Sequence, residues 1–442
     1  MEVLIIAAGR GSRLNNRFSP KPLIPIFGLC LIERIILRAK SAGITKFKIV
    51  VGYKGDRIVE KIGTGDRYGV HVNYIFNSEW EKGNGVSVYK AKGFLKENFI
   101  LLMSDHLFDD SILRKLQQIE PESDCCILCV DRRLNSDHFN IDDITKVWVE
   151  NNKVKEIGKG LDRFNAIDTG IFLCSPVIFN ALEESISKGK YSLSAANQIL
   201  SNRGKLKTYD IGDNFWIDVD DRETLQKAKK ILLEQLKKPT DGPISKSFNR
   251  KISVMISSKL SRLNINPNHL TLISFFLAVL SGLFFFLGGY PKIVIGGFMA
   301  QLSSILDGCD GEIARLKFKQ SKFGEYLDRV LDRYADALII LGMTIACVYK
   351  METIWVWLAG FLALTGSFMI SYTAMQYDEF LISKAFNKKK ASFRMGRDIR
   401  LLIVFIGAVL NQLFATLIIL SIVTNVECIR RLFVLRHEYK LS

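Results

Sequence analysis

The segment from Asp307 to Asp332 reads DGCDGEIARLKFKQSKFGEYLDRVLD, and the residues around it are apolar enough to cross a membrane. An ionisable side chain at membrane depth is costly without a partner, so it usually serves a function. The segment holds two pairs of aspartates, Asp307 with Asp310 and Asp328 with Asp332. Their spacings of three and four residues place each pair on one face of a helix.

Between the two pairs, the basic run at 317–322 interrupts the apolar pattern and predicts a hairpin. Folding the chain back at this run brings Asp310 level with Asp328 and Asp307 level with Asp332. Four carboxylates then converge, and their oxygens are the ligands that hard divalent cations prefer. A metal ion held there can bind and polarise a phosphate. The alternative, four unrelated charges at helix ends, leaves the shared geometry of these spacings unexplained.

The same stretch resembles the signature of the CDP-alcohol phosphatidyltransferase family, D-x-x-D-G-x-x-A-R followed by G-x-x-x-D-x-x-x-D. Its fixed positions are filled by Asp307, Asp310, Gly311, Ala314, Arg315, Gly324, Asp328 and Asp332. The resemblance implies an enzyme that displaces CMP from a CDP-linked alcohol with the hydroxyl of a second alcohol. It also implies that the four aspartates bind metal and that Asp332 acts as the base. By the same resemblance, Gly311, Ala314 and Arg315 line the CDP pocket.

Apolar segments of membrane-spanning length follow one another from about His269 onward. We predict six spans, at 268–289, 292–315, 324–349, 353–377, 398–411 and 412–432. The last two lie in one apolar run that could instead form a single tilted helix, but Asn411 marks a break. With six spans, all segments rich in Lys and Arg lie on one side, which the positive-inside rule makes cytoplasmic. The predicted protein is therefore a multi-pass cell-membrane protein with a cytoplasmic C-terminus.

We predict three parts: a cytosolic domain at 1–235, a linker with an amphipathic juxtamembrane helix at 236–265, and the membrane domain at 266–442. A plain connecting helix is the alternative for the middle part. We expect the first domain to be cytoplasmic, because Met1 and Glu2 lead directly into a strand without a secretory signal. The membrane explains the net charge of +16 without nucleic-acid binding. Eight cysteines without a C-x-x-C pair predict neither a disulfide framework nor zinc.

The first domain opens with a buried parallel strand at 3–8, directly followed by a glycine-rich loop. Such a loop can bind phosphates with backbone N–H groups, because glycine allows close approach. Arg13 in the loop and Lys21 after it place two cations near the same phosphates. No G-K-S/T sequence follows, which excludes a Walker loop, and the cations argue against a dehydrogenase-type dinucleotide site.

This arrangement resembles the sugar-nucleotide nucleotidyltransferase family, whose signature A-A-G-x-G-S/T-R-L with a later K-P is complete here. The resemblance implies a Rossmann-like, mixed and mostly parallel α/β sheet. It assigns nucleotide binding to Ala7, Ala8, Gly9, Gly11 and Ser12, and substrate binding to Asn84, Gly85, Lys159, Asp168 and Thr169. It assigns metal binding to Asp105 and Asp218, with Asp220 as the fallback, and charge stabilisation at the attacked phosphate to Arg13 and Lys21. Asp168 and Asn84 could instead cap loops, and we interpret His106 as structural.

The fusion of these two domains resembles the bifunctional family that joins an inositol-1-phosphate cytidylyltransferase to a di-myo-inositol-phosphate-phosphate synthase. The resemblance implies that CTP and inositol 1-phosphate give CDP-inositol and pyrophosphate. A second inositol 1-phosphate then attacks CDP-inositol and releases CMP. Two alternatives remain: a phospholipid synthase that uses a CDP-lipid, and a membrane transferase with a non-catalytic first domain.

The phosphate of the acceptor requires cationic side chains. Arg397 and then Arg394 are the candidates, because Arg397 lies at a helix start, where N–H groups add to anion binding. The alternative role for these arginines is to set the orientation of the chain in the membrane or to contact lipid headgroups. The family resemblance further implies Mg²⁺ or Mn²⁺, with two ions in the membrane domain and one or two in the cytosolic domain, and a homodimer.

Overall fold

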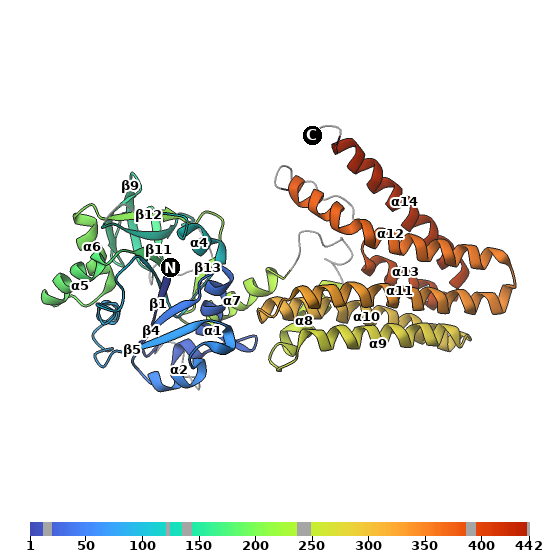
Figure 1. Ribbon diagram of the computed structural model, residues 1–442, viewed down its shortest axis with the longest axis horizontal. Coiled ribbons are helices and arrows are strands. Elements are labelled where there is room, and N and C mark those ends of the chain that lie inside the picture. The colour runs from blue at the N-terminus through green and yellow to red at the C-terminus, as the bar shows by residue number, and fades with distance from the viewer. Residues whose placement is uncertain (12–19, 121–123, 135–143, 237–248, 386–394, 440–442) are drawn as a thin grey trace. The chain divides into compact units, whose positions relative to one another are not determined.

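The computed structural model describes the chain at residues 1–11, 20–120, 124–134, 144–236, 249–385 and 395–439. These residues form two compact units, Met1–Ile231 and Leu232–Ser442. The first unit is an α/β domain and the second is helical (Figure 1). The predicted combination of fold classes is therefore confirmed.

Within the described residues, the first unit contains a nine-stranded sheet of order β5-β4-β1-β6-β11-β8-β12-β10-β9 (Figure 1). Its strands are β1 (Glu2–Ala7), β4 (Lys46–Val51), β5 (His71–Phe76), β6 (Phe99–Met103), β8 (Cys126–Asp131), β9 (Lys146–Glu150), β10 (Lys153–Gly158), β11 (Ala166–Cys174) and β12 (Leu206–Asp210). Parallel pairing joins β5, β4, β1 and β6, and also joins β8 to β12. The other ladders are antiparallel.

Parallel pairing is thus less extensive than the sequence suggested, and one hairpin shows the reason. β9 and β10 are joined by Asn151 and Asn152, whose φ angles are 50° and 58°. Two consecutive residues with positive φ form a tight turn that matches strand twist, and asparagine tolerates this conformation well. A two-residue connection can only produce antiparallel neighbours.

Helices cover both faces of this sheet, and β1 is therefore buried on both sides. Its odd-numbered residues face one apolar cluster, whereas Leu4 and Ile6 face the other. The first cluster includes residues of α1 (Leu31–Ser41), α2 (Gly55–Ile62) and α4 (Asp110–Leu116). The second includes residues of α3 (Asn84–Tyr89), α5 (Val177–Ser187) and α6 (Leu193–Asn202). The result is a three-layer domain in which both faces of β1 are buried.

A short two-stranded ribbon completes the first unit. β7 (His106–Phe108) pairs antiparallel with β13 (Trp216–Asp218), and this register sets Asp218 opposite His106. The pairing joins segments that are far apart in sequence. It therefore brings a late aspartate beside the residues that follow β6.

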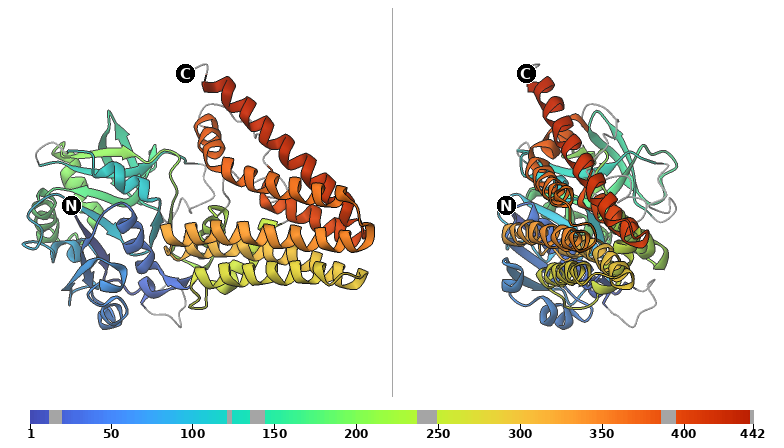
Figure 2. Two further views of the ribbon diagram at one scale, coloured as in Figure 1. Left: turned by 45° about the vertical axis from the view of Figure 1, so that its right-hand side comes forward. Right: turned by 90° about the vertical axis from the view of Figure 1, so that its right-hand side faces the viewer.

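The second unit contains helices near all six predicted spans (Figures 1 and 2). Its helices are α8 (Arg250–Leu260), α9 (Pro267–Phe286), α10 (Tyr290–Leu316), α11 (Lys322–Met351), α12 (Ile354–Ala385), α13 (Arg397–Val409) and α14 (Leu413–Tyr439). α9 and α11 cross closely, because Gly282 and Gly342 bring the two backbones into contact. Asn411, with φ 55°, separates α13 from α14, so the apolar run there is not one helix.

Among the described residues, four of these helices are long and apolar enough to cross a membrane. They are Pro267–Phe286, Lys322–Met351, Ile354–Ala374 and Leu413–Arg436. α10 carries the acidic motif, and α13 has 13 residues, which is short for a span of about 20 residues. The six-span topology therefore stays a prediction.

The predicted hairpin lies between α10 and α11. Phe318 takes a positive φ of 55°, and Ser321 caps α11 by accepting a hydrogen bond from the Gly324 N–H at 2.9 Å. A serine at this position satisfies one of the N–H groups that a helix start leaves without a partner. The turn thus sets the register of the two helices that carry the acidic signature.

Candidate active sites

The first candidate site is a cavity of about 440 Å³ in the α/β unit. Its lining includes these residues predicted from sequence: Gly9, Gly11, Lys21, Asn84, Asp105, Lys159, Asp168, Asp218 and Asp220. Ala7, Ala8, Gly85 and Thr169 are buried. Ser12 and Arg13 lie outside the described residues. Residues that the sequence predicts to bind nucleotide, metal and substrate therefore meet in one cavity.

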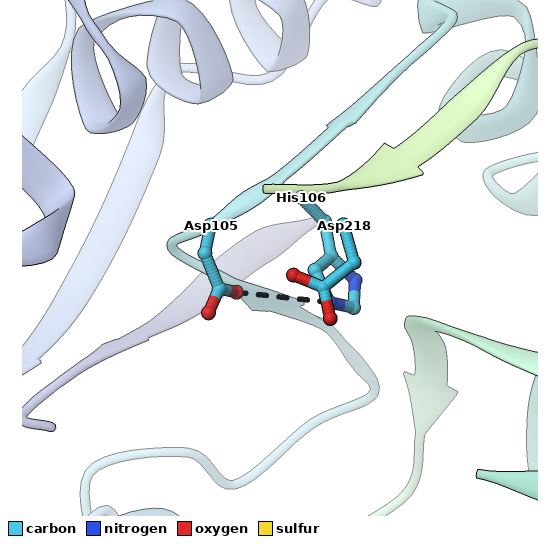
Figure 3. Close-up of side chains that lie close together, drawn as sticks. All are labelled: Asp105, His106 and Asp218. Carbon is cyan, nitrogen blue, oxygen red and sulfur yellow. Dashed lines mark ion pairs between the residues drawn. The ribbon is translucent and has the colours of Figure 1, made fainter. Parts of the chain in front are cut away.

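Two aspartates and a histidine form a group that could bind a metal ion in this cavity (Figure 3). His106 Nε2 lies 3.7 Å from Asp105 Oδ1 and 3.4 Å from Asp218 Oδ2. One ligand atom of each residue lies within 4.8 Å of the others. Asp105 precedes β7 and Asp218 ends β13, so the ribbon pairing creates this group.

Lys21 is a buried cation in this cavity, and its side chain is only 8% exposed. Its Nζ lies 2.6 Å from Asp105 Oδ2, 2.5 Å from Asp220 Oδ1 and 3.8 Å from Asp218 Oδ1. Burial lowers the pKa of Lys21, but the three carboxylates outweigh burial and raise it above its usual value. Burial raises the pKa of Asp105, whereas the positive charge of Lys21 lowers it. The net result is a pKa of about 2 for Asp105. Both groups are therefore charged at neutral pH.

His106 is the residue that the sequence interpretation left out of the site. Its Nδ1 lies 2.7 Å from the carbonyl oxygen of Thr169. Burial lowers the pKa of His106, but Asp218 and Asp105 outweigh burial and raise it to about 9. A signal was present, because His106 directly follows Asp105 at the end of a strand, but sequence alone cannot show what the ring faces.

Asp168 and Asn84 line the cavity and also make local hydrogen bonds. Asp168 Oδ1 accepts from the Gly170 N–H at 2.7 Å, and Asn84 Oδ1 accepts from the Leu193 N–H at 2.9 Å. Burial raises the pKa of Asp168 to about 6. Both the loop-capping role and the substrate-facing role are therefore compatible with their positions.

Gly170 provides a prediction about how the first site is built. Its φ is +69°, and a Cβ there would overlap His106 Nδ1. Gly204 has the same φ of +69°, but no described atom lies within 4 Å of an added Cβ. We expect Gly170→Ala to cost about 1–3 kcal/mol more in unfolding free energy than Gly204→Ala, because only the first is overpacked. Chemical denaturation of both variants would test this, and equal losses would contradict it.

The second candidate site lies where α10 and α11 face each other. One carboxylate oxygen each from Asp307, Asp328 and Asp332 lies within 4.8 Å of the other two. Asp310 instead accepts a hydrogen bond from Thr271 Oγ1 on α9 at 2.5 Å, and another from the Gly311 N–H. The structure therefore gathers three of the four predicted aspartates and turns the fourth toward α9.

Arg397 joins this acidic group from the first turn of α13. Its Nη1 lies 2.6 Å from Asp332 Oδ1 and 3.2 Å from Asp307 Oδ1, and its Nε lies 3.0 Å from Asp336 Oδ1. Arg394, the other predicted acceptor ligand, lies outside the described residues. Arg397 thus stands beside the predicted base.

Asp336 is a second residue that the sequence interpretation missed. It lies four residues after Asp332 on α11, and it contacts Arg400 Nη1 at 3.2 Å and Ser367 Oγ at 2.9 Å in addition to Arg397. The repeated spacing of four was visible in the sequence, but the arginine partners come from a distant helix. Asp336 therefore ties α11 to α12 and α13.

The predicted CDP-pocket residues lie on the last turns of α10. A Cβ on Gly311 would be 3.3 Å from Arg315 Nη1, and Ala314 is half-buried. Arg315 Nη2 donates to the carbonyl oxygen of Leu236 at 3.3 Å. These residues therefore share one end of α10 with the acidic group.

Comparison with known proteins decides the family. The nucleotidyl transferase family matches residues 2–235, and the CDP-alcohol phosphatidyltransferase family matches residues 264–427. A protein named bifunctional IPC transferase and DIPP synthase from Aquifex aeolicus is 34% identical over 436 residues, which cover 97% of each chain. A protein of the same name from Rubrobacter xylanophilus is 32% identical over 436 residues. The match covers 98% of this chain and 96% of the R. xylanophilus protein.

The chain belongs to the family of bifunctional IPC transferases and DIPP synthases. The predicted family and the two predicted transferase classes are therefore confirmed. Among solved structures, the inositol-1-phosphate CTP transferase from T. maritima is 26% identical, with a TM-score of 0.48. The match covers 52% of this chain and 94% of the T. maritima chain.

Both halves of this bifunctional family belong to enzyme classes that use divalent metal ions. The donor sets fit such ions: two carboxylates and an imidazole in the α/β unit, and three carboxylates in the helical unit. Carboxylate oxygens suit Mg²⁺ and Mn²⁺, and an imidazole is also accepted by Mn²⁺. The four apolar helices and the family match together make the second unit a membrane domain.

Asp336 provides a prediction about the membrane domain of this bifunctional enzyme. Removing one partner of a buried ion pair leaves uncompensated charge, so we expect Asp336→Asn to destabilise the domain by about 3–5 kcal/mol. Glu325→Gln on the same helix is the control, because its pair with Arg329 is exposed. Thermal unfolding in detergent should show a large shift for Asp336→Asn and almost none for Glu325→Gln. Matching shifts would contradict the ion-pair arrangement.

Proposed function

We propose that the α/β unit makes CDP-inositol from CTP and inositol 1-phosphate, and that the membrane unit then transfers inositol phosphate to a second inositol 1-phosphate. The observation that carries the proposal is whole-chain similarity to bifunctional IPC transferases and DIPP synthases. Both acidic groups occur here on the elements that the two families match. The products are pyrophosphate from the first step, and CMP with di-myo-inositol phosphate phosphate from the second.

In the first step, the phosphate of inositol 1-phosphate attacks the α-phosphate of CTP and pyrophosphate leaves. A Mg²⁺ or Mn²⁺ ion held by Asp105 and Asp218, with Asp220 as a further candidate, would offset the charge of the phosphates. Lys21 supplies a fixed positive charge at the attacked group, in a buried position where electrostatic stabilisation is strong. Gly9 and Gly11, which line the cavity, would offer backbone N–H groups to the triphosphate.

The same cavity would hold the sugar end of the substrate. Asn84 and Asp168 are proposed to bind inositol hydroxyls, and Lys159 is proposed to bind its phosphate, since all three line the cavity. The raised pKa of Asp168 means that its carboxyl group gains a proton as the pH falls through about 6. The ionised carboxylate accepts hydrogen bonds from hydroxyls and is present above that pH.

In the second step, the acceptor hydroxyl attacks the inositol-linked phosphorus of CDP-inositol. The bond to CMP breaks, and Asp332 takes the proton of the hydroxyl. Metal ions held by Asp307, Asp328 and Asp332 would offset charge on the diphosphate, with Asp310, which accepts a hydrogen bond from α9, as a further candidate. Arg397 lies 2.6 Å from Asp332, so an acceptor whose phosphate binds this arginine has its hydroxyls near the base. Gly311, Ala314 and Arg315 are proposed to bind CDP.

We further propose a cell-membrane protein with six spans whose first domain and C-terminus are cytoplasmic. Two metal ions in the membrane unit, one or two in the α/β unit, and a homodimer complete the proposal. The support is the family match, the four apolar helices and the two acidic groups.

A lipid-free assay tests the proposed function. Purified protein in detergent receives CTP, inositol 1-phosphate and Mg²⁺, and nucleotides are separated over time. We expect CDP-inositol to appear first and CMP with a di-inositol product to follow. Product formation that requires added CDP-lipid would favour a phospholipid synthase. CDP-inositol that accumulates without CMP would contradict the coupled scheme.

Arg397→Gln tests the acceptor site. Because a guanidinium binds phosphate through charge-assisted hydrogen bonds, we expect the KM for inositol 1-phosphate in the second step to rise at least about tenfold. The assay supplies CDP-inositol directly, so the first step is bypassed. Arg329→Gln, which removes an exposed arginine of α11, is the control. An unchanged KM for Arg397→Gln would leave this arginine with a topological or structural role.

A further inference from the structure

We propose that His106 is a ligand of the divalent metal in the α/β unit, through Nε2, alongside Asp105 and Asp218. The inference rests on the proposed function only in placing a metal ion in this cavity. It changes the predicted site from an all-oxygen site to a mixed oxygen and nitrogen site.

The orientation of the ring follows from its hydrogen bond. A carbonyl oxygen can only accept, so the 2.7 Å contact with the Thr169 carbonyl places the hydrogen on Nδ1. In the neutral ring, the lone pair is then on Nε2, which is the usual arrangement of a metal-binding histidine whose other nitrogen donates to backbone. Nε2 faces the carboxylates of Asp105 and Asp218 at 3.7 and 3.4 Å (Figure 3).

The orientation is supported by residues that are themselves fixed. Thr169 is fully buried, and its Oγ1 donates to the Cys129 carbonyl at 2.8 Å, so the acceptor of the His106 hydrogen bond is held in place. Gly170 follows with positive φ, and its missing side chain leaves the space that the imidazole fills. The backbone of β11 is therefore shaped around this ring.

The opposing interpretation is that His106 is an imidazolium that only balances the carboxylates. Lys21 already balances the same carboxylates, with Nζ 2.6 Å from Asp105 and 2.5 Å from Asp220. Lys21 approaches Asp105 through Oδ2, whereas His106 approaches through Oδ1. Lys21 Nζ and His106 Nε2 therefore approach different oxygens of Asp105, and one ligand atom each of Asp105, His106 and Asp218 lies within 4.8 Å of the other two.

Electron spin echo spectroscopy of bound Mn²⁺ tests the assignment directly. Full-length protein in detergent, with Mn²⁺ and CTP, should show modulation from a directly bonded ¹⁴N nucleus. Protein that contains ¹⁵N-histidine should lose that ¹⁴N modulation and show ¹⁵N coupling instead, without any mutation. His106→Gln should also lose it, whereas His71→Gln should retain it, because His71 is exposed on β5.

Each outcome decides between the two interpretations. A Mn²⁺ spectrum without histidine nitrogen coupling overturns the ligand assignment, even if the protein makes CDP-inositol. Coupling that persists in His106→Gln also overturns it. Coupling that disappears only in His106→Gln supports the ligand assignment. The spectroscopic result does not depend on whether CDP-inositol is formed, so a failure of the proposed function is recognised separately.

Discussion

Asp332→Asn should abolish the transfer of inositol phosphate from CDP-inositol while CDP-inositol formation from CTP continues. Asp332 belongs to the acidic group with Asp307 and Asp328, and its Oδ1 lies 2.6 Å from Arg397 Nη1. An asparagine of the same shape cannot accept the proton of the acceptor hydroxyl and is a weaker metal ligand. General-base catalysis alone contributes about 10²–10⁴-fold, so we expect a loss of at least about 10³-fold.

The measurement is CMP release from supplied CDP-inositol, with CDP-inositol formation followed in parallel. Glu325→Gln is the matched control, because it removes an exposed carboxylate from the same helix. Asp332→Asn that retains more than a tenth of the wild-type rate would contradict its role as base. Loss of both reactions would indicate a general folding defect instead.

Lys21→Met should remove CDP-inositol formation and spare the membrane reaction when CDP-inositol is supplied. The replaced charge is buried and lies among Asp105, Asp218 and Asp220, so methionine leaves these carboxylates uncompensated at the proposed site of nucleotidyl transfer. Removing one preorganised electrostatic group from an active site commonly costs about 10²–10³-fold in rate. We expect a loss of that size in the rate of pyrophosphate release.

Lys48→Met is the control for this variant. Lys48 is also a largely buried lysine in an ion pair, with Glu2, but it lies on β4 and does not line the cavity. Its replacement should leave the rate of pyrophosphate release within a few-fold of wild type. A Lys21→Met protein that forms CDP-inositol at the wild-type rate would show that the cavity is not the nucleotidyl-transfer site.

The features that the sequence predicted well depend on local spacing. The basic run between the aspartate pairs predicted the hairpin, and Phe318 and Ser321 form its turn and cap. Asn411 predicted the break between the last two apolar helices, because asparagine accepts a positive φ. A glycine-rich loop after a buried strand likewise predicted where the cavity lies.

The features that were missed depend on contacts between distant segments. Spacing places Asp310 on one face of α10, but it cannot show that Thr271 on α9 offers a hydrogen bond. Nor can it show that α13 directs Arg397 to Asp332 and Asp336. His106 faces Asp218 only because β7 pairs with β13. Tertiary pairing decides each of these, and local pattern carries no information about it.

In the proposed scheme, two sites of one chain act in sequence on the same intermediate, and double labelling follows that intermediate. The purified protein receives CTP labelled with ³²P at the α-phosphate and inositol 1-phosphate labelled with ³³P. Because the bond to CMP breaks in the second step, we predict ³²P only in CTP, CDP-inositol and CMP. The di-inositol product should contain ³³P alone, and both labels should meet only in CDP-inositol. Appearance of ³²P in the final product, or a di-inositol product formed without CDP-inositol, would contradict the account.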